Sequence, residues 1–232
     1  MRGPDAGPSQ RPLQLALALG HEESLAREDF LEGPSNVQAL TLVEAWPDWP
    51  SPVVMLAGPE GRGKSHLAAI WAAASGARVI AGRALAETTP PAALATGALV
   101  IEDLAAGDFD DAALFHVLNL AREEGAFVLL TGRTAPAGWN VALRDLASRL
   151  RALPVVTLAA PDDALLSSVI VKLCADRQLA VDEPMVRYLA SRIERSFGAA
   201  RNAVALLDRE ALRQKRAVNR ALAADLFRDA GA

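Results

Sequence analysis

The feature that most constrains the fold is the segment Gly58-Pro59-Glu60-Gly61-Arg62-Gly63-Lys64-Ser65, which matches the pattern G-x-x-x-x-G-K-[ST]. It follows an apolar run of strand length and precedes a stretch whose apolar residues recur at helical spacing. In this setting the glycines let backbone N–H groups surround a phosphate, and the start of the helix adds partial positive charge. Lys64 then reaches the β- and γ-phosphates, and Ser65 binds Mg²⁺. We therefore predict a site for ATP or ADP with Mg²⁺.

Short apolar runs alternate with helical stretches after residue 53, which predicts an α/β fold with a buried, mainly parallel sheet. The predicted strands are Val53–Ala57, Val79–Ile80, Ala98–Ile101, Phe127–Thr131 and Val155–Leu158. After Pro161 the strands stop, and the spacing predicts helices near residues 163–178, 183–195, 198–213 and 217–228. We therefore divide the chain into an N-terminal segment (1–24), an α/β domain (25–160) and a small helical domain (161–232).

Several polar residues outside the motif are candidates for the same site. Glu102 and Asp103 directly follow the third predicted strand, at the strand end where a nucleotide site needs an acid to hold the metal and orient water. Thr131 ends the next strand at the same sheet edge, and its hydroxyl either reaches the γ-phosphate or is an ordinary strand terminus. Arg149 either contacts nucleotide or pairs with a surface acid, and Arg201 can fold back over the nucleotide.

Composition excludes several classes of protein. The formal net charge is −4, and residues 161–232 carry 12 basic and 10 acidic side chains, which argues against binding nucleic acid mainly through its phosphates. The one cysteine, Cys174, cannot form an internal disulfide and fits a reducing compartment. The longest uncharged stretch, 88–101, is too short to span a bilayer, and the N-terminus lacks a signal-peptide pattern. We expect a cytoplasmic protein without a membrane partner.

An alternating apolar stretch, Gln14-Leu15-Ala16-Leu17-Ala18-Leu19, precedes the α/β domain. We interpret Gln14, Leu15, Leu17 and Leu19 as a short linear motif that docks on a partner. The alternative is an edge strand or packing arm that belongs to the fold.

Together these residues resemble the AAA+ nucleotide-binding family and, within it, the replication-initiator branch. The resemblance covers about residues 25 to 228. Boxes similar to those of the initiator DnaA are Phe30, Gly33-Pro34-Ser35-Asn36, Gly58 to Ser65, the acidic pair and Ser148-Arg149-Leu150. Segments that resemble the Hda-type group of shorter DnaA homologues, of alphaproteobacterial type, are Leu114 to Asn119, Pro161-Asp162-Asp163 and Lys172 to Gln178.

The resemblance implies a three-layer P-loop domain with a five-stranded parallel sheet of order 5-1-4-3-2 and a small helical lid. It places Asn36 near the adenine and makes Thr131 and Arg201 the first and second sensors. It makes Arg149 an arginine finger that acts on nucleotide bound by a neighbouring subunit. The residues assigned to nucleotide binding are thus Asn36, Gly58, Pro59, Glu60, Gly61, Arg62, Gly63, Lys64, Ser65, His66 and Arg201, although we interpret His66 as a packing residue rather than a catalytic one.

At the acidic strand end, the resemblance places Glu102 with Ser65 at the metal and Asp103 at the attacking water. Glu102 is one methylene longer, and Asp103 one shorter, than the residues commonest at these positions. We therefore expect at most slow intrinsic ATP hydrolysis.

The resemblance also implies partners. The segment Gln14 to Leu19 is similar to the peptide with which Hda-type proteins dock on the DNA polymerase III sliding clamp. Bound to ADP, such proteins stimulate ATP hydrolysis by DnaA. Because the chain ends after the lid helices, we expect no sequence-specific DNA binding, and a homodimer is left open. The leading hypothesis is a negative regulator of replication initiation. The alternatives are an AAA+ ATPase or DNA-loading factor whose own turnover is the output, and an adaptor that uses nucleotide only structurally.

Overall fold

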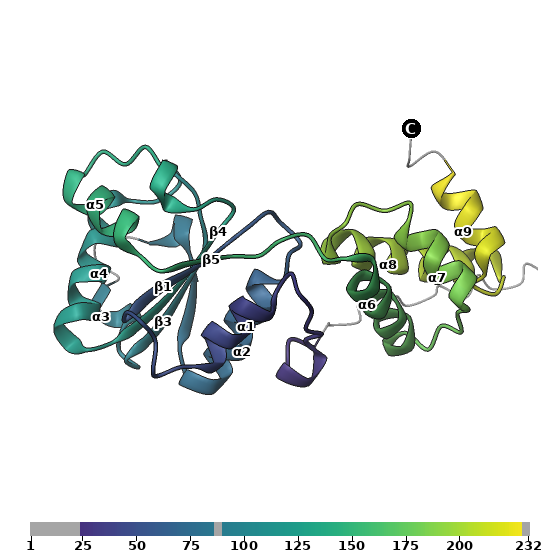
Figure 1. The fold of residues 1–232 in the computed structure, drawn as a ribbon, viewed down its shortest axis with the longest axis horizontal. Helices are drawn as coiled ribbons and strands as arrows, with labels where there is room; N and C mark the ends of the chain where they lie inside the picture. Colours follow the sequence, from purple (N-terminus) through teal and green to yellow (C-terminus); the bar gives the residue numbers. More distant parts are fainter. Residues whose placement is uncertain (1–23, 86–89, 229–232) are drawn as a thin grey trace, which may run out of the picture.

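A computed structural model describes residues 24–85 and 90–228, and it shows a parallel sheet between two helical layers with a helical lid beside them (Figure 1). The strands are β1 (Val53–Ala57), β2 (Arg78–Ala81), β3 (Ala98–Leu104), β4 (Phe127–Gly132) and β5 (Val155–Thr157). Their order is β2-β3-β4-β1-β5, and each pair is parallel. The structure thus confirms the predicted sheet and its order.

Two sets of helices cover the two faces of this sheet. One set is α1 (Val37–Glu44) and α2 (Lys64–Ser75); the other is α3 (Pro90–Ala93), α4 (Asp111–Glu124) and α5 (Arg144–Ala152). Short 3₁₀ turns lie at η1 (Arg27–Asp29), η2 (Gly82–Ala84) and η3 (Pro136–Gly138). Central strands are buried on both sides, because Val54 and Leu56 pack toward α1 and α2 while Val53 and Met55 pack toward α4.

The lid is formed by α6 (Asp163–Asp176), α7 (Glu183–Ala190), α8 (Phe197–Gln214) and α9 (Arg220–Phe227). Its helices enclose a core of their own, separate from the cores on the sheet. Each lid helix starts at a residue whose side chain accepts a hydrogen bond from the first turn, namely Asp162, Asp182, Ser196 and Asn219. Helix α7 ends at Ala190, earlier than the predicted 195. Within the described ranges, no helix has the length and apolarity that crossing a membrane requires.

Candidate nucleotide-binding site

The glycine-rich segment turns between β1 and α2, as predicted from the sequence. Gly58 has a φ of 144°, and a Cβ there would lie 2.8 Å from the carbonyl oxygen of Leu158. Gly63 caps the first turn of α2 with a φ of 93°, a conformation that residues with a side chain rarely adopt. The loop therefore ends on the N-terminus of a 12-residue helix, which favours a bound anion.

Lys64 is held inside this loop. Its Nζ donates hydrogen bonds to the carbonyl oxygens of Gly58 at 2.7 Å and Pro59 at 2.8 Å, and only 7% of the residue is exposed. Burial lowers the pKa of Lys64, and the nearby carboxylate of Asp103 opposes that shift. An anion in the loop stabilises the charged form of this amine, so the site is electrostatically suited to phosphate.

A cavity of about 250 Å³, the phosphate cavity, opens beside the loop. Its cations are Lys64, Arg133 and Arg201, and its carboxylates are Glu60 and Asp103; Gly61, Gly63, Ser65 and His66 also line it. Arg133 pairs with Glu60 at 2.7 Å, and both side chains are largely exposed. Sequence reasoning did not assign Arg133 a role, because an exposed arginine after a strand carries no local signal.

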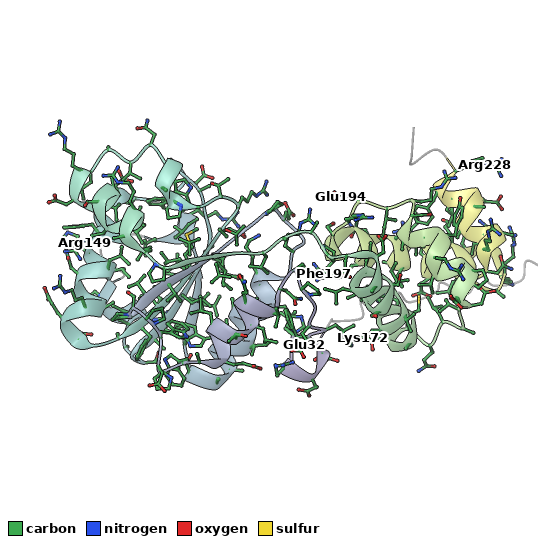
Figure 2. The ribbon with its side chains drawn as sticks, in the orientation of Figure 1. Glu32, Arg149, Lys172, Glu194, Phe197 and Arg228 are labelled. Atoms are coloured by element: carbon green, nitrogen blue, oxygen red, sulfur yellow. The ribbon has the colours of Figure 1, made fainter. Side chains whose placement is uncertain are left out.

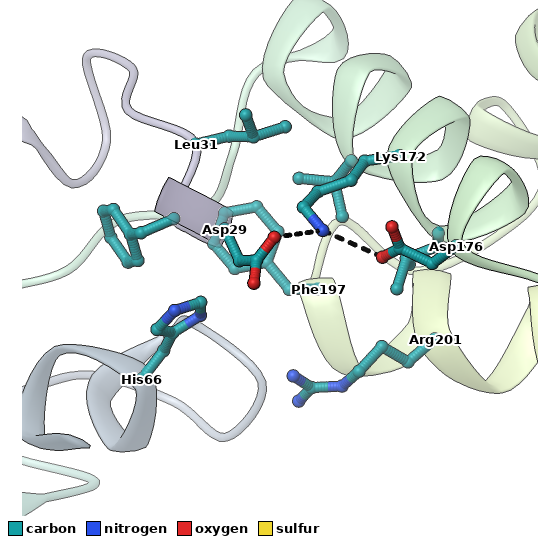
Figure 3. A pocket seen from close by; sticks show the side chains of 11 residues that line it. Asp29, Leu31, His66, Lys172, Asp176, Phe197 and Arg201 are labelled. Atoms are coloured by element: carbon teal, nitrogen blue, oxygen red, sulfur yellow. Dashed lines mark hydrogen bonds and ion pairs between the residues drawn. The ribbon is translucent and has the colours of Figure 1, made fainter. Parts of the chain in front are cut away.

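A smaller cavity, the apolar cavity, adjoins the first and shares Gly63, His66 and Arg201 with it. Its apolar lining is Phe30, Leu31, Val169, Leu173 and Phe197. Figure 3 shows Lys172 between Asp29 and Asp176, with both ion pairs at 2.8 Å. These residues tie the segment before α1 to lid helix α6 at the rim of the cavity. Of the residues that line this cavity, the sequence assigned Gly63, His66 and Arg201 to nucleotide binding and gave the others no such role.

His66 lines both cavities and packs against the segment before α1. Its Nε2 donates to the carbonyl oxygen of Ala26 at 2.9 Å, and its ring meets Phe30 edge-on with centroids 5.1 Å apart. Burial lowers the pKa of His66, so the ring is neutral at physiological pH. His66 thereby fixes residues 26–30 against the glycine-rich segment 58–65, which we call the phosphate loop.

Two more assigned loop residues face the lid. The carbonyl oxygen of Gly61 accepts a hydrogen bond from the N–H of Phe197 at 2.8 Å. Arg62 donates to the carbonyl oxygen of Arg195 and lies 4.0 Å from Glu194, on the loop before α8 (Figure 2). The loop that surrounds the phosphate is therefore also fastened to the lid.

The acidic pair is split between two environments. Asp103 lines the phosphate cavity, and Glu102 is not among the residues that line it. One oxygen of Glu102, Oε1, is buried without a hydrogen-bond partner among the residues that the structure describes. The described residues hold no group of three or more metal-ligating side chains, but Mg²⁺ in nucleotide sites needs only one or two carboxylates besides phosphates and water. Ser65 and the unpartnered oxygen of Glu102 fit that requirement.

The remaining candidates lie outside both cavities. Asn36 is 2% exposed, and its side chain accepts from Gly33 N–H at 2.8 Å and donates to Leu31 O at 3.0 Å, so it holds the loop before α1. Thr131 is fully buried beneath Asp103. Arg149 lies on α5, remote from the lid, with its guanidinium 5.0 Å from the centroid of the Phe115 ring (Figure 2). The motif Gln14 to Leu19 lies outside the described residues.

Comparison with known proteins identifies the architecture. No family model matches the chain, and no curated protein matches its sequence. Domain III of the Thermotoga maritima replication initiation protein DnaA superposes with a TM-score of 0.73 at 19% identity, covering 88% of this chain and 96% of that one. The chain has the AAA+ fold. The Thermotoga maritima RuvB Holliday junction branch migration motor gives a TM-score of 0.70 at 18% identity (88% and 72% covered), and AMPPCP-bound DnaA from Aquifex aeolicus gives 0.63 at 19% (81% and 68%).

Proposed function

We propose that this chain is an Hda-type member of the AAA+ family that binds ADP or ATP, with Mg²⁺, between its α/β domain and its lid. The observation that carries the proposal is the junction of two cavities. One is cationic at a helix N-terminus, as a phosphate chain requires, and the other is apolar, as a base requires. Mg²⁺, where bound, would lower the charge repulsion of the phosphates, and Ser65 and Glu102 are its ligands in this proposal.

We further infer that the protein is a negative regulator of replication initiation, which docks on the sliding clamp and stimulates ATP hydrolysis by the initiator DnaA. The likeness of its fold to domain III of the replication initiation protein DnaA supports this role. Arg149 is remote from the chain's own cavities, so its guanidinium is available to a neighbour's nucleotide. These partners belong to the cytoplasm, which suits Cys174, whose thiol is buried with its pKa raised by that burial to about 11.

The experiment that tests the role follows the ATP bound to the initiator in the presence of clamp on DNA. Wild-type protein should accelerate its hydrolysis, and Arg149→Ala should abolish the acceleration, because an arginine finger contributes about 10³ to 10⁵ in rate. Arg144→Ala, an exposed arginine on the same helix, is the matched control. If ATP disappears equally fast with Arg149→Ala, the residue only packs on Phe115 and the finger assignment fails.

Clamp docking has its own test. Changing Gln14, Leu15, Leu17 and Leu19 together to Ala should abolish clamp binding, while the melting temperature and nucleotide affinity stay unchanged. Buried leucines contribute about 1.5–3 kcal/mol each, partly offset by ordering of the peptide. A lower melting temperature with clamp binding retained would show that the segment belongs to the fold.

A second candidate is an ATPase whose own turnover is the output. The likeness to RuvB and the carboxylate of Asp103 in the phosphate cavity favour it. Sustained fast hydrolysis by the purified chain, without initiator or clamp, would support this candidate. Slow turnover under those conditions supports the regulator.

A further inference from the structure

The end of β3 contains a bulge opposite Thr131. Ile101 pairs with Leu130 and Leu104 pairs with Gly132, so Glu102 and Asp103 together oppose one residue of β4. Asp103 has a φ of 55°, which is uncommon for a residue other than glycine. Bulges of this kind redirect side chains and occur often beside functional sites.

The bulge changes which side chains face which way. Leu99 and Ile101 pack in the core toward α4, so strict alternation along the strand would put residue 103 in that core. Instead Leu104 joins the core and is 1% exposed, while Asp103 is exposed and lines the phosphate cavity. The extra residue therefore moves the carboxylate of Asp103 out of the core and toward the site.

Thr131 supports this irregular turn. It is fully buried, and its Oγ1 accepts a hydrogen bond from the N–H of Asp103 at 3.1 Å. That N–H has left the regular ladder at the bulge, and a partly buried amide without a partner is costly. The hydroxyl thus stabilises the backbone conformation that directs Asp103.

We propose that Thr131 is a positioning residue which, through Asp103, sets the discrimination between nucleoside triphosphate and diphosphate. This inference rests on the proposed nucleotide binding. The carboxylate of Asp103 shares the phosphate cavity with Lys64 and is the leading carboxylate in the electrostatic environment of its amine. A third phosphate in the same cavity is repelled by this carboxylate when no divalent cation lies between them. Thr131 itself touches no ligand.

The test measures the affinities of ADP and ATP in EDTA, where hydrolysis does not interfere, and compares the ratio Kd(ATP)/Kd(ADP) among variants. Asp103→Asn should lower the ratio by about three- to thirtyfold, as expected for removing one charge near a phosphate. Thr131→Val should lower it by less, and Thr131→Ser should restore the wild-type ratio. Added to Asp103→Asn, Thr131→Val should change the ratio no further, because its action requires the carboxylate.

Asp108→Asn is the matched control, since it makes the same chemical change at an exposed carboxylate after β3 that lines neither cavity, and it should leave the ratio unaltered. The inference is overturned if Asp108→Asn lowers the ratio as Asp103→Asn does, or if Thr131→Val acts equally in both backgrounds. Asp103→Gly, whose backbone readily adopts a positive φ, removes the carboxylate without altering the buried Thr131 and should match Asp103→Asn. If the wild-type chain binds neither nucleotide, the proposed function fails instead.

Discussion

The phosphate cavity and the apolar cavity adjoin, yet they are assembled in different ways. The phosphate cavity takes most of its lining from one continuous stretch, residues 60–66. The apolar cavity combines three separate segments, 29–31, 169–176 and 197–201, with Gly63 and His66. Local backbone preferences build the first, because its glycines and helix start specify a shape. Only tertiary packing of lid on sheet domain builds the second.

The largest loss of nucleotide affinity should come from removing a cation of the phosphate cavity. Lys64→Ala removes a charge-assisted contact worth about 1.5–3 kcal/mol, so ADP affinity should fall by about one to two decades. Isothermal titration calorimetry measures this, with Arg209→Ala, an exposed cation of α8, as the control. Unchanged ADP affinity in Lys64→Ala would remove the basis of the phosphate assignment.

A substitution in the apolar cavity should weaken binding of the base and leave binding of the phosphates unchanged. Phe197→Ala should weaken ADP binding by about tenfold, since it removes part of the apolar contact with the base. Pyrophosphate, which has no base, should bind the variant as it binds the wild type. Lys64→Ala, in contrast, should weaken both ligands. Equal losses for ADP and pyrophosphate in Phe197→Ala would mean that the residue acts on the loop rather than on the base.

The smallest effect concerns His66, which lines both cavities. Burial holds its pKa below the ordinary value of about 6.5, so the unfolded chain takes up a proton that the folded chain resists. The contribution of His66 to stability is therefore complete above about pH 6.5 and declines as the pH falls through the lowered pKa. Urea denaturation at pH 7.5 and pH 5.5 should show a smaller pH-dependent loss for His66→Gln. An identical loss in wild type and variant would contradict this.

The sequence predicted those elements that short-range patterns of residues specify. The strands β1, β3 and β4 and the helices α2 and α4 have clear periodicity, and the phosphate loop has its glycines. Helix α1 was not predicted, and the side chain of Asn36 holds the loop that precedes it. The resemblance placed Asp103 in the site, but the periodicity of the strand did not, because strict alternation puts residue 103 in the core and only the burial of Leu104 reveals the bulge. The resemblance assigned Asn36 and Thr131 to the nucleotide. In the structure, the side chain of Asn36 bonds to the backbone of Leu31 and that of Thr131 to the backbone of Asp103, two residues that line the cavities.

The hydrogen bond from the Phe197 N–H to the Gly61 carbonyl oxygen makes movement of the lid relative to the phosphate loop measurable. The amide proton of Phe197 is shielded from water while its partner is the phosphate loop. The lid has a separate core, so it can move away from the loop without unfolding. Hydrogen exchange at this single amide therefore measures the free energy of parting lid from loop, and a ligand that joins the two should slow the exchange in proportion to its affinity.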